Sequence, residues 1–102
     1  MNISEIPLSP DNQKFTVTLA GTTYVMRLIW RDPVWCLDIL NTDGTTVVAP
    51  SLPLVTGLDL LAPYEYLDLG FGLVVGCDTA GQDYPTKTDL GLASHLYVIT
   101  ES

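Results

Sequence analysis

The feature of this sequence that most constrains its fold is an alternation of apolar and polar side chains with a period of two. Such alternation is typical of β-strands that bury one face. It runs through residues 15–19, resumes at residues 24–31 after an Ala20-Gly21 turn, and returns at residues 35–40. The first half of the chain is therefore predicted to form a β-meander.

Turn residues separate these runs. Asp32-Pro33 is expected to break the second strand, because proline has no backbone N–H to donate to a sheet. Asn41-Thr42-Asp43-Gly44 has the composition of a hairpin turn, so residues 45–49 are predicted to return as the partner strand. Pro50 and Pro53 then limit regular strand pairing to a sheet edge.

The second half of the chain predicts two more strands and at most two short helical turns. The strands are expected at residues 73–78 and 95–100, with a polar loop over residues 79–85. Thr56 resembles a helix N-cap, with Asp59 three residues later, and Pro63 is expected to end that helix within two turns.

A further helical turn is expected at Thr86-Lys87-Thr88-Asp89. These segments add up to an all-β protein, either a small antiparallel β-sandwich or a partly open β-barrel with one or two short helical turns. A chain of 102 residues is expected to form one domain, over residues 1–102.

The charge balance excludes several partners. The chain carries 4 Lys+Arg against 12 Asp+Glu, a net charge of −8. Nucleic acids and anionic membranes are not expected partners, because both bind clusters of Lys and Arg. The sequence predicts neither a membrane-spanning segment nor a signal peptide, since it lacks a long apolar run and a basic N-terminal region.

No catalytic, metal or cofactor site is predicted. His95 is the single histidine and is expected to be a strand residue, although a small hydrolase using it as a base remains an alternative. Cys36 and Cys77 have no partners at metal-ligand spacing and are expected to be buried free thiols, with a disulfide as the less favoured alternative. Gly70-Phe71-Gly72 is too short for a phosphate loop.

The aromatic residues divide into two groups. Those that alternate along the strands are predicted to lie in the core: Phe15, Tyr24, Trp30 and Trp35. Tyr64 and Tyr66, in the proline-flanked segment, are predicted to be exposed and to contact a partner, because tyrosine is enriched at interfaces. A sugar-stacking platform is the alternative for the aromatic set.

Three stretches, in their order and spacing, resemble the baseplate plug proteins of contractile-tailed bacteriophages. The first joins Ile6-Pro7-Leu8 to residues 12–19, and the second joins residues 24–30 to residues 35–39 and an Asp43-Gly44 turn. The third and most specific is residues 53–64, Pro-Leu-Val-Thr-Gly-Leu-Asp-Leu-Leu-Ala-Pro-Tyr. The 31–34 link is shorter than this family pattern leads us to expect.

The resemblance implies a structural virion protein rather than an enzyme. It would be made in the host cytoplasm and lie in the tail baseplate, on the tail axis, with the hub, spike and tail-tube proteins as partners. With a trimeric hub, the resemblance also implies a threefold or a matched stoichiometry, with a homo-oligomer as one form of it. The alternative is a small β-sandwich module that binds a carbohydrate or a peptide.

A partner surface is predicted in residues 50–66, an irregular segment rich in leucine, proline and tyrosine. A chain with few charged residues (16%) and many apolar ones (47%) is expected to leave apolar surface exposed, which often marks an interface. The residues predicted to make contact are Leu54, Leu58, Leu61, Pro63, Tyr64 and Tyr66.

Overall fold

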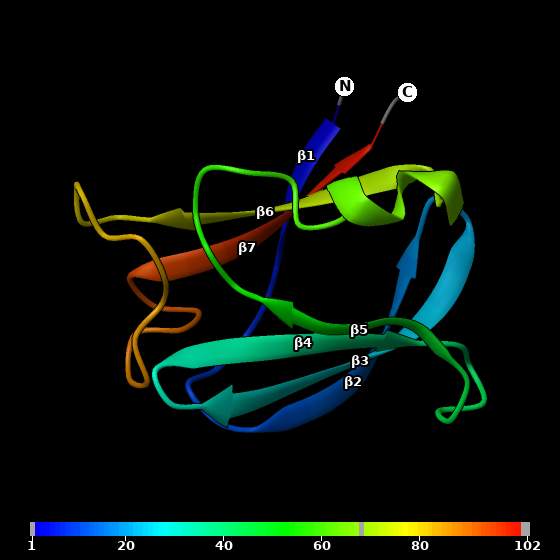
Figure 1. The fold of residues 1–102 in the computed structure, drawn as a ribbon, viewed down its shortest axis with the longest axis horizontal. Helices are drawn as coiled ribbons and strands as arrows, with labels where there is room; N and C mark the ends of the chain where they lie inside the picture. The colour runs from blue at the N-terminus through cyan, green and yellow to red at the C-terminus, as the bar shows by residue number, and fades with distance from the viewer. Residues whose placement is uncertain (1, 68, 101–102) are drawn as a thin grey trace.

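The computed structural model describes residues 2–67 and 69–100, which form two antiparallel β-sheets and one short 3-10 helix (Figure 1). In chain order the elements are β1 (Asn2–Ile6), β2 (Gln13–Leu19), β3 (Thr22–Arg31), β4 (Val34–Leu40), β5 (Val47–Pro53), η1 (Ala62–Leu67), β6 (Phe71–Cys77) and β7 (Ser94–Thr100). The predicted all-β class is confirmed.

The chain divides its strands unequally between the two sheets. The first meander forms a four-stranded sheet in the order β2-β3-β4-β5, and the other sheet has the order β1-β7-β6. Figure 1 shows β6 and β7 stacked over the four-stranded sheet, with η1 beside β6. The start of β1 lies beside the end of β7, where Asn2 pairs with Thr100. The architecture is a sandwich rather than a barrel, because no strand pairing joins one sheet to the other among the described residues.

The core lies between the sheets and follows the alternation in the sequence. Met26 pairs with Ile39 and Leu28 with Leu37 across β3 and β4, and all four side chains are fully buried. From the other sheet, Leu73 and Val75 of β6 and Leu96 and Val98 of β7 close the core.

Strand β5 differs from its predicted bounds. The sequence predicts a strand at residues 45–49, whereas β5 begins at Val47 and continues through Pro50 to Pro53. The later start has a local cause, because Asp43 accepts hydrogen bonds from the backbone N–H groups of Thr45 and Thr46 and holds them in the turn. The strand can include two prolines because it lies at the sheet edge, as predicted.

The predicted helix start is wrong in its details. Thr56 does not cap the helix but forms a bridge with Val75 of β6, and its hydroxyl donates to the carbonyl of Asp83. Asp59 instead accepts the N–H of Leu61 just before η1. Pro63 lies inside the first turn of η1 rather than ending it, because a helix tolerates proline where backbone N–H groups lack helical partners.

The second predicted helical turn is also wrong. Residues 86–89 form a turn, closed by a hydrogen bond from the Thr86 N–H to the Asp89 carboxylate at 2.7 Å. The link between β3 and β4 is as short as the sequence suggests, because Arg31 and Val34 already pair across it. No helix in the described residues is long and apolar enough to cross a membrane.

Candidate partner-binding surface

The segment between β5 and η1 is fixed to both sheets by its backbone. The N–H of Leu54 donates to the carbonyl of Trp35 in β4, at 2.9 Å. The N–H of Leu60 donates to the carbonyl of Leu73 in β6, at 2.8 Å. Together with the bridge between Thr56 and Val75, these bonds make the irregular segment a rigid connection along one side of the sandwich.

Asp59 orders the end of this segment. Its Oδ1 atom accepts the backbone N–H of Leu61 at 2.9 Å and that of Leu73 at 3.0 Å, so one carboxylate joins the entrance of η1 to β6. Gly72 makes room for it, because a Cβ at that position would lie 2.7 Å from the other carboxylate oxygen. Gly72, which the sequence excludes from a phosphate loop, is thus a close-packing position.

The six residues predicted to contact a partner occupy different environments. Leu54 and Leu61 are 0% and 4% exposed and belong to the core, so their side chains are not available to a partner. Leu58 and Tyr66 are 51% and 78% exposed. Pro63 is also exposed. The predicted exposure of Tyr64 is wrong, because its ring is half-buried and packs against the core.

An apolar hollow of about 270 Å³ lies between β5 and η1. It brings together Leu58, Pro63 and Tyr64 from the six predicted contact residues with other members of the predicted 50–66 segment, namely Pro50, Ser51, Leu52, Pro53, Val55 and Leu60. We call this the apolar hollow. In the sequence, the high density of proline and leucine indicates this surface. Its concave shape is not visible there, because it depends on the path of the segment across the two sheets.

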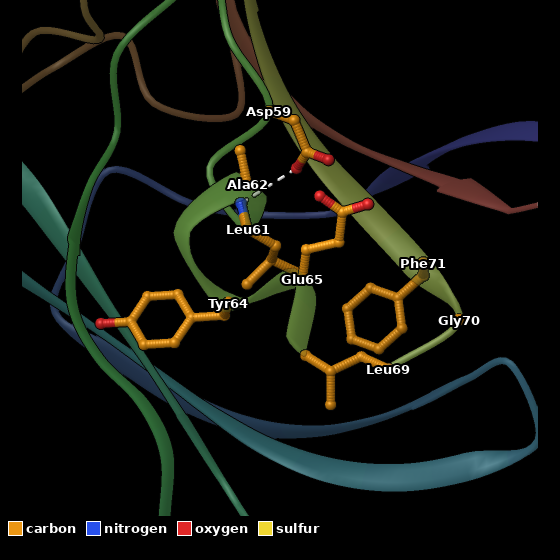
Figure 2. Close-up of a pocket in the computed structure, with 8 residues that line it drawn as sticks. All are labelled: Asp59, Leu61, Ala62, Tyr64, Glu65, Leu69, Gly70 and Phe71. Carbon is orange, nitrogen blue, oxygen red and sulfur yellow. Dashed lines mark hydrogen bonds between the residues drawn. The ribbon is translucent and has the colours of Figure 1, made fainter. Parts of the chain in front are cut away.

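A second hollow of similar volume opens on the other side of Tyr64 (Figure 2). The lining includes the acidic side chains of Asp59 and Glu65 and the apolar side chains of Leu69 and Phe71, and in this view the Tyr64 ring points away from them. No group of three or more His, Cys, Asp or Glu side chains that could hold a metal ion occurs in the described residues.

Both ring nitrogens of the single histidine, His95, contact carboxylates. His95 Nδ1 lies 2.8 Å from Glu5 Oε2, and Nε2 lies 3.2 Å from Asp78 Oδ1. The hydrogen bond to Glu5, aided by Asp78, raises the pKa of His95 above its ordinary value of 6.5, although partial burial opposes the shift. Both ring nitrogens are engaged, so the site offers no support for hydrolysis through His95.

The two tryptophans pack into the sandwich, and the two cysteines are unpaired. Trp35 is 1% exposed, and its indole N–H donates to the carbonyl of Thr86 at 2.9 Å. Trp30 is half-buried and packs edge-on against it, with ring centroids 5.4 Å apart. Cys36 and Cys77 are free thiols, as predicted, but each is half-buried rather than buried.

Comparison with known proteins decides the family. A family model described as "Cyanophage baseplate Pam3 plug gp18" matches residues 3–101. The chain belongs to this family of phage baseplate plug proteins. The resemblance carried by the three sequence stretches is thereby confirmed, and the baseplate plug is a component of the virion tail. Comparison with curated proteins gave no match.

Membership in a structural family also favours a role without catalysis. A baseplate plug associates with other baseplate components, so its exposed apolar surface has a functional explanation. The apolar hollow and the exposed side chains near it are a candidate surface for such an association.

Proposed function

We propose that this baseplate plug lies on the tail axis and docks onto the hub and spike proteins through the surface formed by residues 50–66. The observation that carries the proposal is the apolar hollow, which the exposed Leu58 lines and which Tyr66 adjoins through the Tyr64 ring, with ring centroids 6.4 Å apart. A concave apolar site bordered by an exposed tyrosine has the composition of an interface core.

The rigidity of the segment supports the same proposal. Backbone bonds to Trp35 and Leu73, together with the Asp59 carboxylate, hold the surface in place before any partner arrives. A pre-ordered surface loses less conformational entropy on binding, so a small contact area can still give a stable complex.

Co-expression with the hub and spike proteins encoded beside the chain tests the proposal. Size-exclusion chromatography with light scattering measures the mass of the product. A stable complex of defined stoichiometry is the expected result, and matched or threefold copy numbers would fit a trimeric hub. A chain that elutes alone as a folded monomer would count against the docking surface and favour the ligand-binding alternative.

A further inference from the structure

The four edge strands of the two sheets differ in how well their outer edges are protected. The edge of β5 contains Pro50 and Pro53, neither of which has an N–H to donate. Between them, Ser51 has a positive φ of 50°, and its N–H donates to Asp38 Oδ1. Prolines and an irregular backbone prevent the pairing of another strand, so this edge is closed.

The edge of β6 is closed by the chain itself. Leu73 donates its N–H to Asp59 Oδ1 and accepts the N–H of Leu60. Further along the same strand, Val75 forms a bridge with Thr56. The irregular segment before η1 therefore occupies the place where an additional strand would pair.

The edges of β1 and β2 are open. Strand β1 pairs only with β7, and β2 pairs only with β3. Neither strand contains a proline, so each presents backbone N–H and C=O groups that no strand of the described chain pairs with. An unprotected edge of this kind is a template for pairing with another chain.

The two open edges border the same hollow, which has a volume of about 310 Å³. Its lining includes inward-facing side chains from both strands, among them Ser4 and Ile6 of β1 and Val17 and Leu19 of β2. Ser4 is exposed and Val17 is half-buried, although their alternation directs them between the sheets. The core is thus incompletely covered along this side, which we call the open seam.

We propose that the open seam binds an extended β-strand contributed by another baseplate protein. Unpaired backbone groups along β1 and β2 fit the main chain of such a strand, and the hollow fits alternate side chains that point inward. The incoming strand is expected to carry apolar residues at these alternate positions. This is strand addition, in which the backbone supplies affinity and the pockets supply specificity.

The negative charge of this chain indicates which kind of strand the open seam would bind. Glu5 is the charged residue that lines the seam, and its side chain is 41% exposed. The whole chain has a net charge of −8. Glu5 already pairs with His95 at 2.8 Å, so the net charge carries the argument. A strand with Lys or Arg is favoured, whereas a second copy of this chain would bring another eight negative charges to the same contact.

The inference depends on membership in the baseplate family but not on the docking surface of residues 50–66. The seam is lined by β1, β2 and β7, whereas the apolar hollow is lined by β5 and the residues around η1. One surface can therefore fail its test while the other passes.

Hydrogen–deuterium exchange on the unaltered protein tests the seam directly. Exchange is compared between the free chain and baseplates isolated from virions. Amides on the outer edges of Asn2–Ile6 and Gln13–Leu19 are expected to exchange at least about tenfold more slowly in the baseplate, because pairing protects them. Unchanged rates would overturn the proposal, as would a free chain that already dimerises with these edges protected.

A matched pair of variants gives a second readout. Ser4→Lys places a charge in the open seam, where the free chain can still extend it into water but an incoming strand cannot bury it. Thr16→Lys, on the outward face of β2, is the control. Both variants should keep the thermal midpoint, and Ser4→Lys alone should reduce incorporation into baseplates by about tenfold or more. Equal incorporation would overturn the proposal.

Discussion

Asp38 accepts the backbone N–H of Ser51 at 2.7 Å, while Ser51 has a φ of 50° in the middle of β5. The same carboxylate forms an ion pair with Arg27 on the neighbouring strand through a short charged hydrogen bond. Ser51 also lines the apolar hollow. A nearly buried acid in β4 therefore sets the backbone shape of the proposed docking surface.

Replacing Asp38 tests this relationship. Asp38→Ala removes the acceptor for Ser51 and the partner of Arg27, and should destabilise the fold by about 2–3 kcal/mol, as expected for charged hydrogen bonds. Asp38→Asn keeps one acceptor and should cost less. Urea unfolding of the two variants measures both effects, and wild-type stability in Asp38→Ala would contradict the role assigned to this residue.

The contribution of Asp38 to the stability of the fold should also depend on pH. Burial raises the pKa of Asp38, but the hydrogen bonds from Ser51 and Arg27 and the nearby positive charges outweigh it and hold the pKa below its ordinary value of 3.8. The contribution of Asp38 is therefore present above pH 3.8 and lost as the pH falls through the lowered value. The stability gap to Asp38→Asn should narrow in that acidic range.

Gly91 approaches the carbonyl of Leu8 so closely that a Cβ would overlap it, and its φ is 79°. Gly81 has a similar φ of 81°, but a Cβ added there would meet nothing within 4 Å. Gly81→Ala should therefore cost about 1–2 kcal/mol from backbone conformation alone. Gly91→Ala should cost a further 1–3 kcal/mol, roughly, from overpacking. Equal losses in thermal or urea unfolding would show that the backbone relaxes around Leu8.

His95 should make the stability depend on pH near neutrality. Its pKa is raised in the folded chain by Glu5 and Asp78, so protonation favours folding. The contribution is complete below pH 6.5 and is lost as the pH rises through the raised folded-state value. A His95→Gln variant should therefore melt below the wild type at pH 5.5 and close to it at pH 9. A difference in melting temperature between the two proteins that grows with pH would contradict the raised pKa of His95.

The acidity of the chain predicts that it does not retain DNA. A surface with a net charge of −8 repels phosphate, which would keep an axial tail protein from sticking to DNA in transit. Fluorescence anisotropy with labelled duplex DNA at low salt should show no binding. Binding that weakens with salt along the slope of phosphate contacts would contradict the prediction. The alternative explanation is that the negative charge only keeps the protein soluble, and that explanation predicts nothing about DNA binding.

The strands were predictable because their burial repeats with a short period. Met26, Leu28, Leu96 and Val98 alternate in the sequence and are buried in the structure. One rule is enough to predict such strands from the sequence, namely that the apolar side chains face the other sheet.

The segment around residues 50–67 was harder to predict because its shape depends on distant residues. Asp59 acts through Leu73 of β6, and Ser51 depends on Asp38 of β4. Nothing in the local sequence indicates these partners. The irregular apolar character of the segment was predictable, but the burial of Leu54 and Leu61 follows from the same tertiary contacts and was missed.

The docking surface predicts a separation between binding and stability. Leu58 and Tyr66 are mostly exposed, so Leu58→Ser and Tyr66→Ser remove little packing from the folded chain. Interface anchors of this kind typically contribute about 1–2 kcal/mol or more to binding. The double variant should therefore weaken the complex with hub and spike proteins at least about tenfold, with a nearly unchanged thermal midpoint.

Tyr64→Ser provides the contrast within the same segment. Tyr64 is half-buried, packs against the core and lines both hollows, so its loss should lower the thermal midpoint as well as binding. Leu61→Ser, in the core, should unfold the chain most readily of all. Light scattering of the co-expressed complexes and thermal melts of the free variants give the two readouts. If the exposed pair lost stability as much as Tyr64→Ser does, its effect on assembly would reflect folding, and the docking surface would have to lie elsewhere.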